Sequence, residues 1–218
     1  MNILSTSKTI WIFLLLALPI VVVGQGRMID GGIGIGTSHF VGDVGGGDRL
    51  DLPIYPEFDI EATRPTFEVY FRYYLNPHIA LRANGLLGWL YGDDKYAEFN
   101  NDPDAFFRYY RNLHFRTHIA EVSGRVEFKL REMTYHWKSK KWSPFVTVGA
   151  GLLHFDPKAK YNDEWVRLQP LGTEGQGLES VFPERKKYSL IQPNVQLGAG
   201  LKFLLSPDLF LNFEINHR

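Results

Sequence analysis

The sequence predicts an all-β protein: a small antiparallel up-and-down transmembrane β-barrel, with eight strands in the intact protein. Three observations support this prediction. Segments with a period of two recur along the chain, no later segment has a convincing helical period, and very short connections alternate with long polar ones. Seven such segments are present, whereas bacterial single-chain barrels have an even number of strands, so we expect the last strand to be missing from this chain.

The N-terminus has the layout of a secretory signal peptide. One positive charge, Lys8, precedes an apolar run that is followed by small residues near Gly24. A proline interrupts the run, which is shorter than the roughly 20 apolar residues of a membrane-spanning helix, so a retained anchor is the weaker alternative. We expect residues 1–24 to be a signal peptide cleaved between Gly24 and Gln25, and residues 25–218 to form one barrel domain.

Composition narrows the class of protein further. The chain contains no cysteine, so it forms no disulfide and carries no lipoprotein anchor. Its 24 Lys and Arg residues balance 24 Asp and Glu residues, which gives no electrostatic reason to expect a nucleic-acid partner. Aromatic residues make up 15% of the chain, and this favours strands over helices.

Alternation is clearest in residues 64–92, "RPTFEVYFRYYLNPHIALRANGLLGWLYG". Odd positions are apolar and even positions are mostly polar, and Asn76 and Pro77 interrupt the run. This pattern predicts a hairpin with a tight turn. Trp89 and Tyr91 end its second strand, where an interfacial aromatic girdle is expected in a membrane barrel.

Five further strands follow from the same pattern. They cover about residues 29–41, 113–130, 143–155, 188–205 and 208–215. In the segment 113–130 the apolar phase changes from odd positions such as Ile119 to even positions such as Val122, which predicts a β-bulge near Ala120 and Glu121.

The connections between the strands alternate in length. The long ones cover about residues 43–63, 92–112 and 156–187, and the others are short or moderate turns. Short turns at one end and long loops at the other are typical of bacterial outer-membrane barrels, in which the long loops lie outside the cell.

A soluble barrel of the lipocalin type would also alternate, but its apolar face would point inward. We favour the membrane barrel because the polar face carries opposite charges that can pair inside a lumen. The residues expected in this lumen polar network are Glu68, Arg72, Arg82, His114, Arg116, His118 and Glu214. A small barrel is just wide enough for side chains to fill, so a filled interior is expected and a wide pore is not.

Sequence features that would indicate catalysis or cofactor binding are weak. His114 and His118 are four apart, which on a strand separates them by about 13 Å, too far to share a metal ion. The segments "GGIGIG" and "GTEGQG" lack the spacing of nucleotide-binding loops. Ser123 and His154 are candidates for a lipid-modifying enzyme, but nothing pairs them. We therefore expect no enzymatic activity, no catalytic or metal-binding residues and no cofactor.

Two further segments are candidates for contact with partners. The polar stretch 168–177, "LQPLGTEGQG", is expected to be a self-packed extracellular loop with an extended entry, folded over the barrel mouth with a nearby tryptophan beneath it; a partner-binding surface is the alternative. Its motif residues are Trp165, Gln169, Pro170, Gly172, Glu174, Gly175 and Gly177. In the turn "REMTYHWKSKKW", Lys138, Lys140 and Lys141 are candidates for a periplasmic contact with an acidic partner, or simply a solvated charged turn.

Several stretches in order resemble one known family. They include "GGIGIGTSHFVGDV", "RPTFEVYFRYYLNPHIALRANGLLGWLYGDD", "RNLHFRTHIAEVSGRVEF", "HFDPKA", "WVRLQPLGTEGQG" and "YSLIQPNVQLGAGLKFLLS". Together they look like the PorG-type outer-membrane β-barrel family of Bacteroidota, a DUF6089-type porin-like group.

This resemblance implies a component of the type IX secretion and gliding-motility machinery, located in the outer membrane. Such a barrel would contact outer-membrane lipid and help to tie the periplasmic ring, formed by a lipoprotein and its partner, to the membrane. The resemblance implies no catalytic residues. A small porin-like or surface-binding barrel and, less favoured, a lipid A-modifying enzyme are the alternatives.

Overall fold

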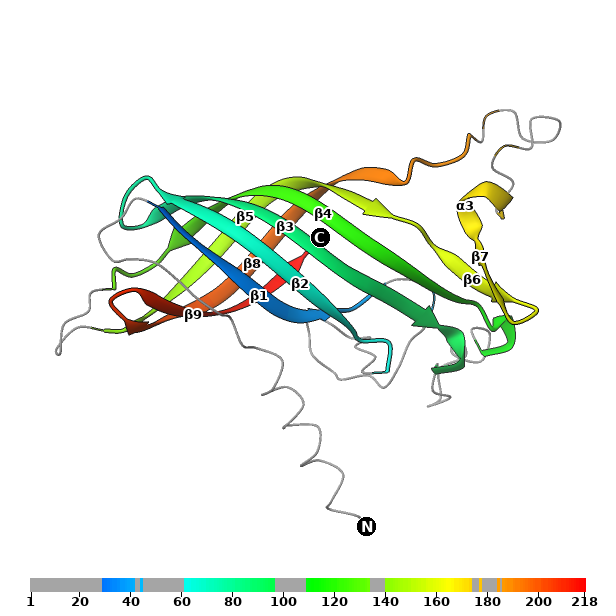
Figure 1. Ribbon diagram of the computed structural model, residues 1–218, viewed down its shortest axis with the longest axis horizontal. Coiled ribbons are helices and arrows are strands. Elements are labelled where there is room, and N and C mark those ends of the chain that lie inside the picture. Colours follow the sequence, from blue (N-terminus) through cyan, green and yellow to red (C-terminus); the bar gives the residue numbers. More distant parts are fainter. Residues whose placement is uncertain are drawn as a thin grey trace, which may run out of the picture.

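The computed structural model describes residues 29–41, 44, 61–96, 109–133, 140–173, 177, 184 and 186–218. These residues form one antiparallel sheet that curls into a half-barrel (Figure 1). The predicted all-β, up-and-down architecture is therefore confirmed. The expected signal peptide lies outside the described residues.

Seven long strands build the sheet in chain order. They are β1 (Ile29–Ser38), β2 (Arg64–Tyr74), β3 (Ile79–Asp93), β4 (His114–Lys129), β5 (Trp142–Phe155), β8 (Ile191–Ser206) and β9 (Leu209–His217). Each pairs with the next, and within the described part of the chain β1 and β9 are the edge strands, with no ladder between them. No helix among the described residues is long and apolar enough to cross a membrane.

The connections after β2, β4 and β8 leave the sheet at one end, called here the turn end, and those after β1, β3 and β5 leave it at the opposite end, called the loop end. Between β2 and β3, the side-chain oxygen of Asn76 accepts hydrogen bonds from the backbone N–H groups of His78 and Ile79, each at 2.8 Å. This side chain thus fixes the turn that the Asn76-Pro77 pair predicts. Between β8 and β9, a register shift at Leu204 and Ser206 precedes the turn.

The third long connection contains a hairpin that was not expected from the sequence. It consists of β6 (Lys158–Tyr161) and β7 (Glu164–Arg167), followed by the single helical turn α3 (Leu168–Leu171). Asn162 and Asp163 form its two-residue turn, and both have positive φ angles, of 48° and 66°. Asn and Asp tolerate this conformation, so the pair "ND" within an alternating stretch was the missed signal. A short 3-10 helix, η1 (Asp94–Tyr96), follows β3.

The predicted β-bulge near Ala120 and Glu121 is wrong. The register of β4 is uninterrupted against both neighbours, from Ile119 opposite Phe155 to Lys129 opposite Phe145, and equally along β3. What changes at this point is polarity and not backbone phase. Ile119 points inward with the polar residues, while the preceding outward positions are polar.

The two faces of the sheet have opposite character. The outward face is apolar and exposed: the exposed fractions are 67% for Phe71, 72% for Val122, 69% for Val195 and 69% for Ile215. The interior face is polar and buried. Its buried residues include Asp30, Arg72, Arg82, Asn84, Glu121, Ser123, Arg125, Glu127, Thr147, Gln196 and Lys202. This is the reverse of a soluble barrel, in which apolar side chains fill the interior.

Glycines on the inner side of β1 make room for an aromatic ring from β2. A Cβ atom on Gly32 would lie 2.6 Å from the hydroxyl oxygen of Tyr70, so the tyrosine ring occupies the space that a side chain would need. The same hydroxyl accepts a hydrogen bond of 3.0 Å from the side-chain amide of Asn212 on β9. The glycine-rich ribbon therefore permits a contact between opposite sides of the half-barrel.

Candidate functional site: an ion-paired barrel interior

A buried cluster of charges fills the interior near the turn end. Arg72 donates to Asp30 at 2.9 Å and to Glu127 at 2.9 Å, and it is only 1% exposed. The Lys202 ammonium group lies 3.4 Å from the other oxygen of Glu127. Tyr74 links Asp30 to Lys202, because its hydroxyl donates to Asp30 at 2.6 Å and accepts from Lys202 at 2.9 Å. Two cations and two carboxylates thus neutralise one another.

A second cluster occupies the middle of the interior. Arg82 donates to Glu68 at 2.5 Å and also to Glu214, which comes from the far edge strand β9. Arg125 reaches Glu214 at 3.0 Å and Gln196 at 2.5 Å. The Arg82 guanidinium also lies 4.5 Å from the centre of the Tyr70 ring, a cation–π contact. These contacts bind β3, β4 and β9 together across the hollow of the sheet.

A third group continues the network toward the loop end. The carboxylate of Glu121 accepts from Asn194 at 2.8 Å and from Arg218 at 2.9 Å, and Arg125 lies 3.7 Å from its second oxygen. Arg125 therefore contacts both the second and third groups. The interior is occupied by paired side chains along the sheet, and this arrangement fits structural filling better than an aqueous channel.

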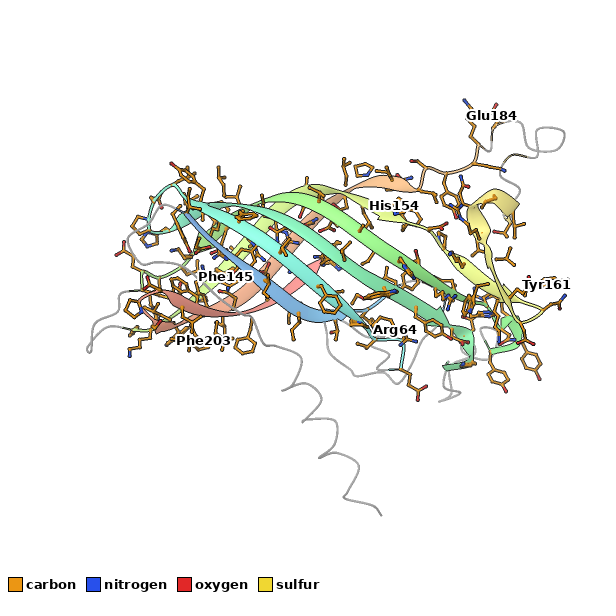
Figure 2. All side chains as sticks on the ribbon, in the orientation of Figure 1. Arg64, Phe145, His154, Tyr161, Glu184 and Phe203 are labelled. Carbon is orange, nitrogen blue, oxygen red and sulfur yellow. The ribbon has the colours of Figure 1, made fainter. Side chains whose placement is uncertain are left out.

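Figure 2 labels one phenylalanine on each face of the sheet. Phe145 on β5 is 1% exposed and lies within the curve of the sheet, whereas Phe203 on β8 points away from it. Phe203 packs edge-on against Phe213 of β9, with ring centres 5.9 Å apart. Alternation along each strand decides the face, as the period of two requires.

Of the seven residues expected in the lumen polar network, the structure brings four together. Glu68, Arg72, Arg82 and Glu214 lie on the interior face in the clusters described above. The other network members were harder to find from the sequence. Asp30 stands in a glycine ribbon, and Glu121 and Arg125 lie at and just after the position where a bulge was wrongly expected. Their opposite charges at interior positions of adjoining strands were the available signal.

The other three residues, His114, Arg116 and His118, lie on the outward face, so their placement in the lumen is wrong. His118 is directly opposite Trp89, with ring centres 5.7 Å apart, and Arg116 is opposite Tyr91. The error follows from the false bulge, because a polar run was taken to mean the interior. These positions are at the loop end of β4, beyond the apolar part of the outward face.

The loop motif is only partly within the described residues. Gly172 and Gly177 have positive φ angles of 60° and 79°, as the loop prediction requires, and Glu174 and Gly175 lie outside the described part. The extended entry at Gln169 and Pro170 is wrong. These residues form the helical turn α3, where proline is tolerated because a first-turn N–H has no helical acceptor.

Contacts of this loop run to its own return segment and to β4. The side-chain amide of Gln169 donates to the carbonyl of Tyr188 at 3.2 Å, and Lys187 donates to the carbonyl of Pro170 at 2.9 Å. The described ring contacts of Trp165 are with β4, and its packing under the loop stays a prediction because much of the loop lies outside the described residues. Its ring packs beneath the guanidinium of Arg116, whose central carbon is 3.6 Å from the ring centre.

The remaining candidate residues give no composite site. Lys140 and Lys141 are exposed at the turn end, and Lys138 lies outside the described residues. Ser123 is buried on the interior face, whereas His154 is exposed on the outward face, so the two cannot act together. In the part of the chain that the structure describes, no group of three or more His, Cys, Asp or Glu residues could hold a metal ion.

Apolar exterior, ion-paired interior and antiparallel meander together define a protein of the up-and-down β-barrel class. The chain belongs to the family described as a domain of unknown function, DUF6089, whose family model matches residues 8–169. Comparison with curated proteins and with solved structures finds no match.

Proposed function

We propose that this protein is a non-enzymatic outer-membrane β-barrel whose filled interior makes it a structural element and not a pore. The observation that carries the proposal is the reversed polarity of the sheet. Monomeric soluble proteins rarely expose apolar patches of more than a few hundred Å², yet here the exposed side is apolar on every long strand. Such a face is compatible with the hydrocarbon of a membrane. The hydrogen bonds between neighbouring strands satisfy the backbone N–H and C=O groups within the sheet.

A charge on the outward face tests the membrane assignment. Val122 lies in the middle of β4 and is 72% exposed, so Val122→Arg places a cation in the hydrocarbon, at a cost of roughly 2–4 kcal/mol near the midplane. We expect the variant to insert poorly into vesicles. Leu171→Arg is the control, since Leu171 is also exposed but belongs to α3, outside the barrel wall. Equal insertion of both variants would contradict the proposal.

We propose further that the barrel serves the type IX secretion apparatus by linking its periplasmic ring to the outer membrane. Support for this finer role comes from the resemblance to PorG-type barrels and from membership of the DUF6089 family. A filled, rigid barrel suits an anchoring role, because its exposed turns and loops can hold partners without passing solutes. The exposed Lys140 and Lys141 at the turn end are the candidates for contact with the ring.

Deletion of the gene tests this role directly. We expect loss from the cell surface and medium of those proteins that carry type IX sorting domains, with the general outer-membrane composition unchanged. Complementation with a gene in which Lys140 and Lys141 are replaced by glutamate then tests the contact through co-purification of the ring. Normal secretion in the deletion strain would contradict the secretion role while leaving the barrel assignment intact.

A small porin is the alternative function, and single-channel recording distinguishes it. The paired charges of Arg72, Glu127 and Lys202 are buried across the interior near the turn end. We therefore expect no steady large conductance from the full-length protein in planar bilayers. A stable ohmic channel would favour the porin.

A further inference from the structure

Three cations stand side by side on the outward face at the loop end. Arg116 on β4 is directly opposite Lys158 on β6, and Lys158 is directly opposite Arg167 on β7. Residues directly opposite in antiparallel strands project from the same face of the sheet. We call this set, Arg116, Lys158 and Arg167, the outer cation row.

Among the described residues, carboxylates balance only one of the three charges of the outer cation row. Arg167 is paired with Asp156, at 3.0 Å. Among the described residues, no carboxylate lies within 4 Å of the charged groups of Arg116 or Lys158. Like charges placed directly opposite in a sheet are destabilising, so this arrangement favours an anion from outside the chain.

Packing holds one member of the row, Arg116, in place. Arg116 stacks on Trp165 at 3.6 Å, and the Trp165 ring lies edge-on to His114 with centres 6.0 Å apart. The backbone N–H of Lys160 donates to the ring nitrogen Nε2 of His114 at 3.0 Å. Stacking fixes the plane of the guanidinium but leaves its N–H edge available for a phosphate.

The position of the outer cation row in the barrel indicates which kind of anion it would bind. Tyr91 lies opposite Arg116, and Trp89 opposite His118, so the row is level with the aromatic residues that mark a membrane interface. Farther along β4 toward the turn end, the outward face has a groove of about 500 Å³ over Ala120. Its lining is mainly apolar and includes Phe67, Leu87, Val122 and Leu152.

We propose that the outer cation row binds the phosphate of an anionic lipid in the membrane leaflet at the loop end, with an acyl chain lying in the groove over Ala120. The proposal rests on the membrane location proposed above. His154, which lines the groove and is labelled in Figure 2, adds a polar group on the headgroup side of the chain site. Charge complementarity at the row and an apolar groove beside it match the two parts of such a lipid.

Native mass spectrometry of the full chain in detergent micelles tests the site, with phosphatidylglycerol and phosphatidylcholine as probes. We expect the wild type to retain phosphatidylglycerol preferentially. Lys158→Gln keeps the Arg116–Trp165 stack and should weaken that preference about fivefold, as expected for one cation near an anionic lipid. Lys95→Gln is the matched control, since Lys95 is a loop-end cation already paired with Asp93 at 3.0 Å. The preference of this variant for phosphatidylglycerol should equal that of the wild type.

Several results would overturn the lipid site. The lipid site would be contradicted by equal retention of both lipids, or by an unchanged preference in Lys158→Gln. Displacement by inorganic phosphate at the lipid concentration would also contradict it, because that would indicate a site for free anions. Insertion into vesicles is measured on the same samples. A protein that inserts without lipid preference loses only this inference, whereas one that fails to insert loses the barrel proposal as well.

Discussion

Arg125 on β4 donates a hydrogen bond of 3.0 Å to Glu214 on β9, across the hollow of the sheet and between strands that share no ladder. Arg82 on β3 binds the other oxygen of the same carboxylate. One glutamate therefore joins β3, β4 and β9.

Replacement of this carboxylate should be strongly destabilising. Glu214→Gln removes the negative charge that Arg82 and Arg125 share and leaves both cations short of a partner in a buried site. Removal of one member of a buried pair costs roughly 3–5 kcal/mol, and we expect a loss near the lower limit because glutamine still accepts a hydrogen bond. Urea titration in detergent micelles measures the free energy of unfolding. Glu164→Gln, at an exposed position of β7, should leave it unchanged, and similar values for the two variants would contradict the argument.

The hydroxyl of Tyr74 is a second test of the interior network. It donates to Asp30 and accepts from Lys202, so Tyr74→Phe leaves two buried charged groups each without one partner. We expect a loss of about 2 kcal/mol in the free energy of unfolding, from the cost of unsatisfied buried groups. Tyr161→Phe serves as the control because Tyr161 is 71% exposed at the hairpin turn. A neutral Tyr74→Phe variant would mean that the hydroxyl bonds are replaced by water.

The strands were predictable from the sequence because a period of two is a local signal. It identified all seven long strands and the interior positions of Arg72 and Arg82. It failed where polarity and face diverge: Ile119 is apolar inside, and His118 is polar outside. Near the loop end the outward face also carries polar residues. The polarity of a residue there therefore does not indicate which face of the sheet it lies on. The unbroken register with β3, a non-local property, shows that β4 has no bulge and places His118 on the side of Trp89.

The outer cation row was not predictable for the same reason. Arg116 and Lys158 are 42 positions apart by residue number, and they become neighbours only because β6 returns along β4. The positive φ angles of Asn162 and Asp163 set the register of β7 against β6, which brings Arg167 opposite Lys158. This two-residue turn thus determines which charged residues of β6 and β7 lie opposite each other. The turn residues can be read from the sequence, but the pairing that they produce cannot.

Substitution by alanine should affect stability differently at two neighbouring glycines of the sheet, Gly151 and Gly124. A Cβ on Gly151 would lie 2.7 Å from the backbone oxygen of Val122 and 2.7 Å from the Cβ of Ser123, and neither atom can move away freely. A Cβ on Gly124 would have no atom within 4 Å. We expect Gly151→Ala to lower the free energy of unfolding by roughly 1–3 kcal/mol and Gly124→Ala to be neutral or slightly stabilising. Equal effects on urea midpoints would show that the ladder relaxes at Gly151.

The hairpin of β6 and β7 should depend on a single aromatic contact with β4. Trp165 packs under Arg116 and beside His114, and within the described ladders only one residue pair, Arg116 with Lys158, joins β4 to β6. Trp165→Ala removes that packing, so the hairpin should open more often and be cleaved faster by trypsin, which has Lys158, Lys160 and Arg167 as sites in it.

The measurement is the rate of loop cleavage in intact cells or vesicles, where the barrel wall is protected. Tyr161→Ala is the matched control, because it deletes an aromatic ring of the same hairpin that is 71% exposed. Cation–π and aromatic contacts of this kind contribute about 1–2 kcal/mol, which predicts a roughly tenfold increase in cleavage for Trp165→Ala and none for the control. If both variants are cleaved at the wild-type rate, the hairpin is held by its backbone ladder alone, and the stacked Arg116 is then not the element that positions the outer cation row.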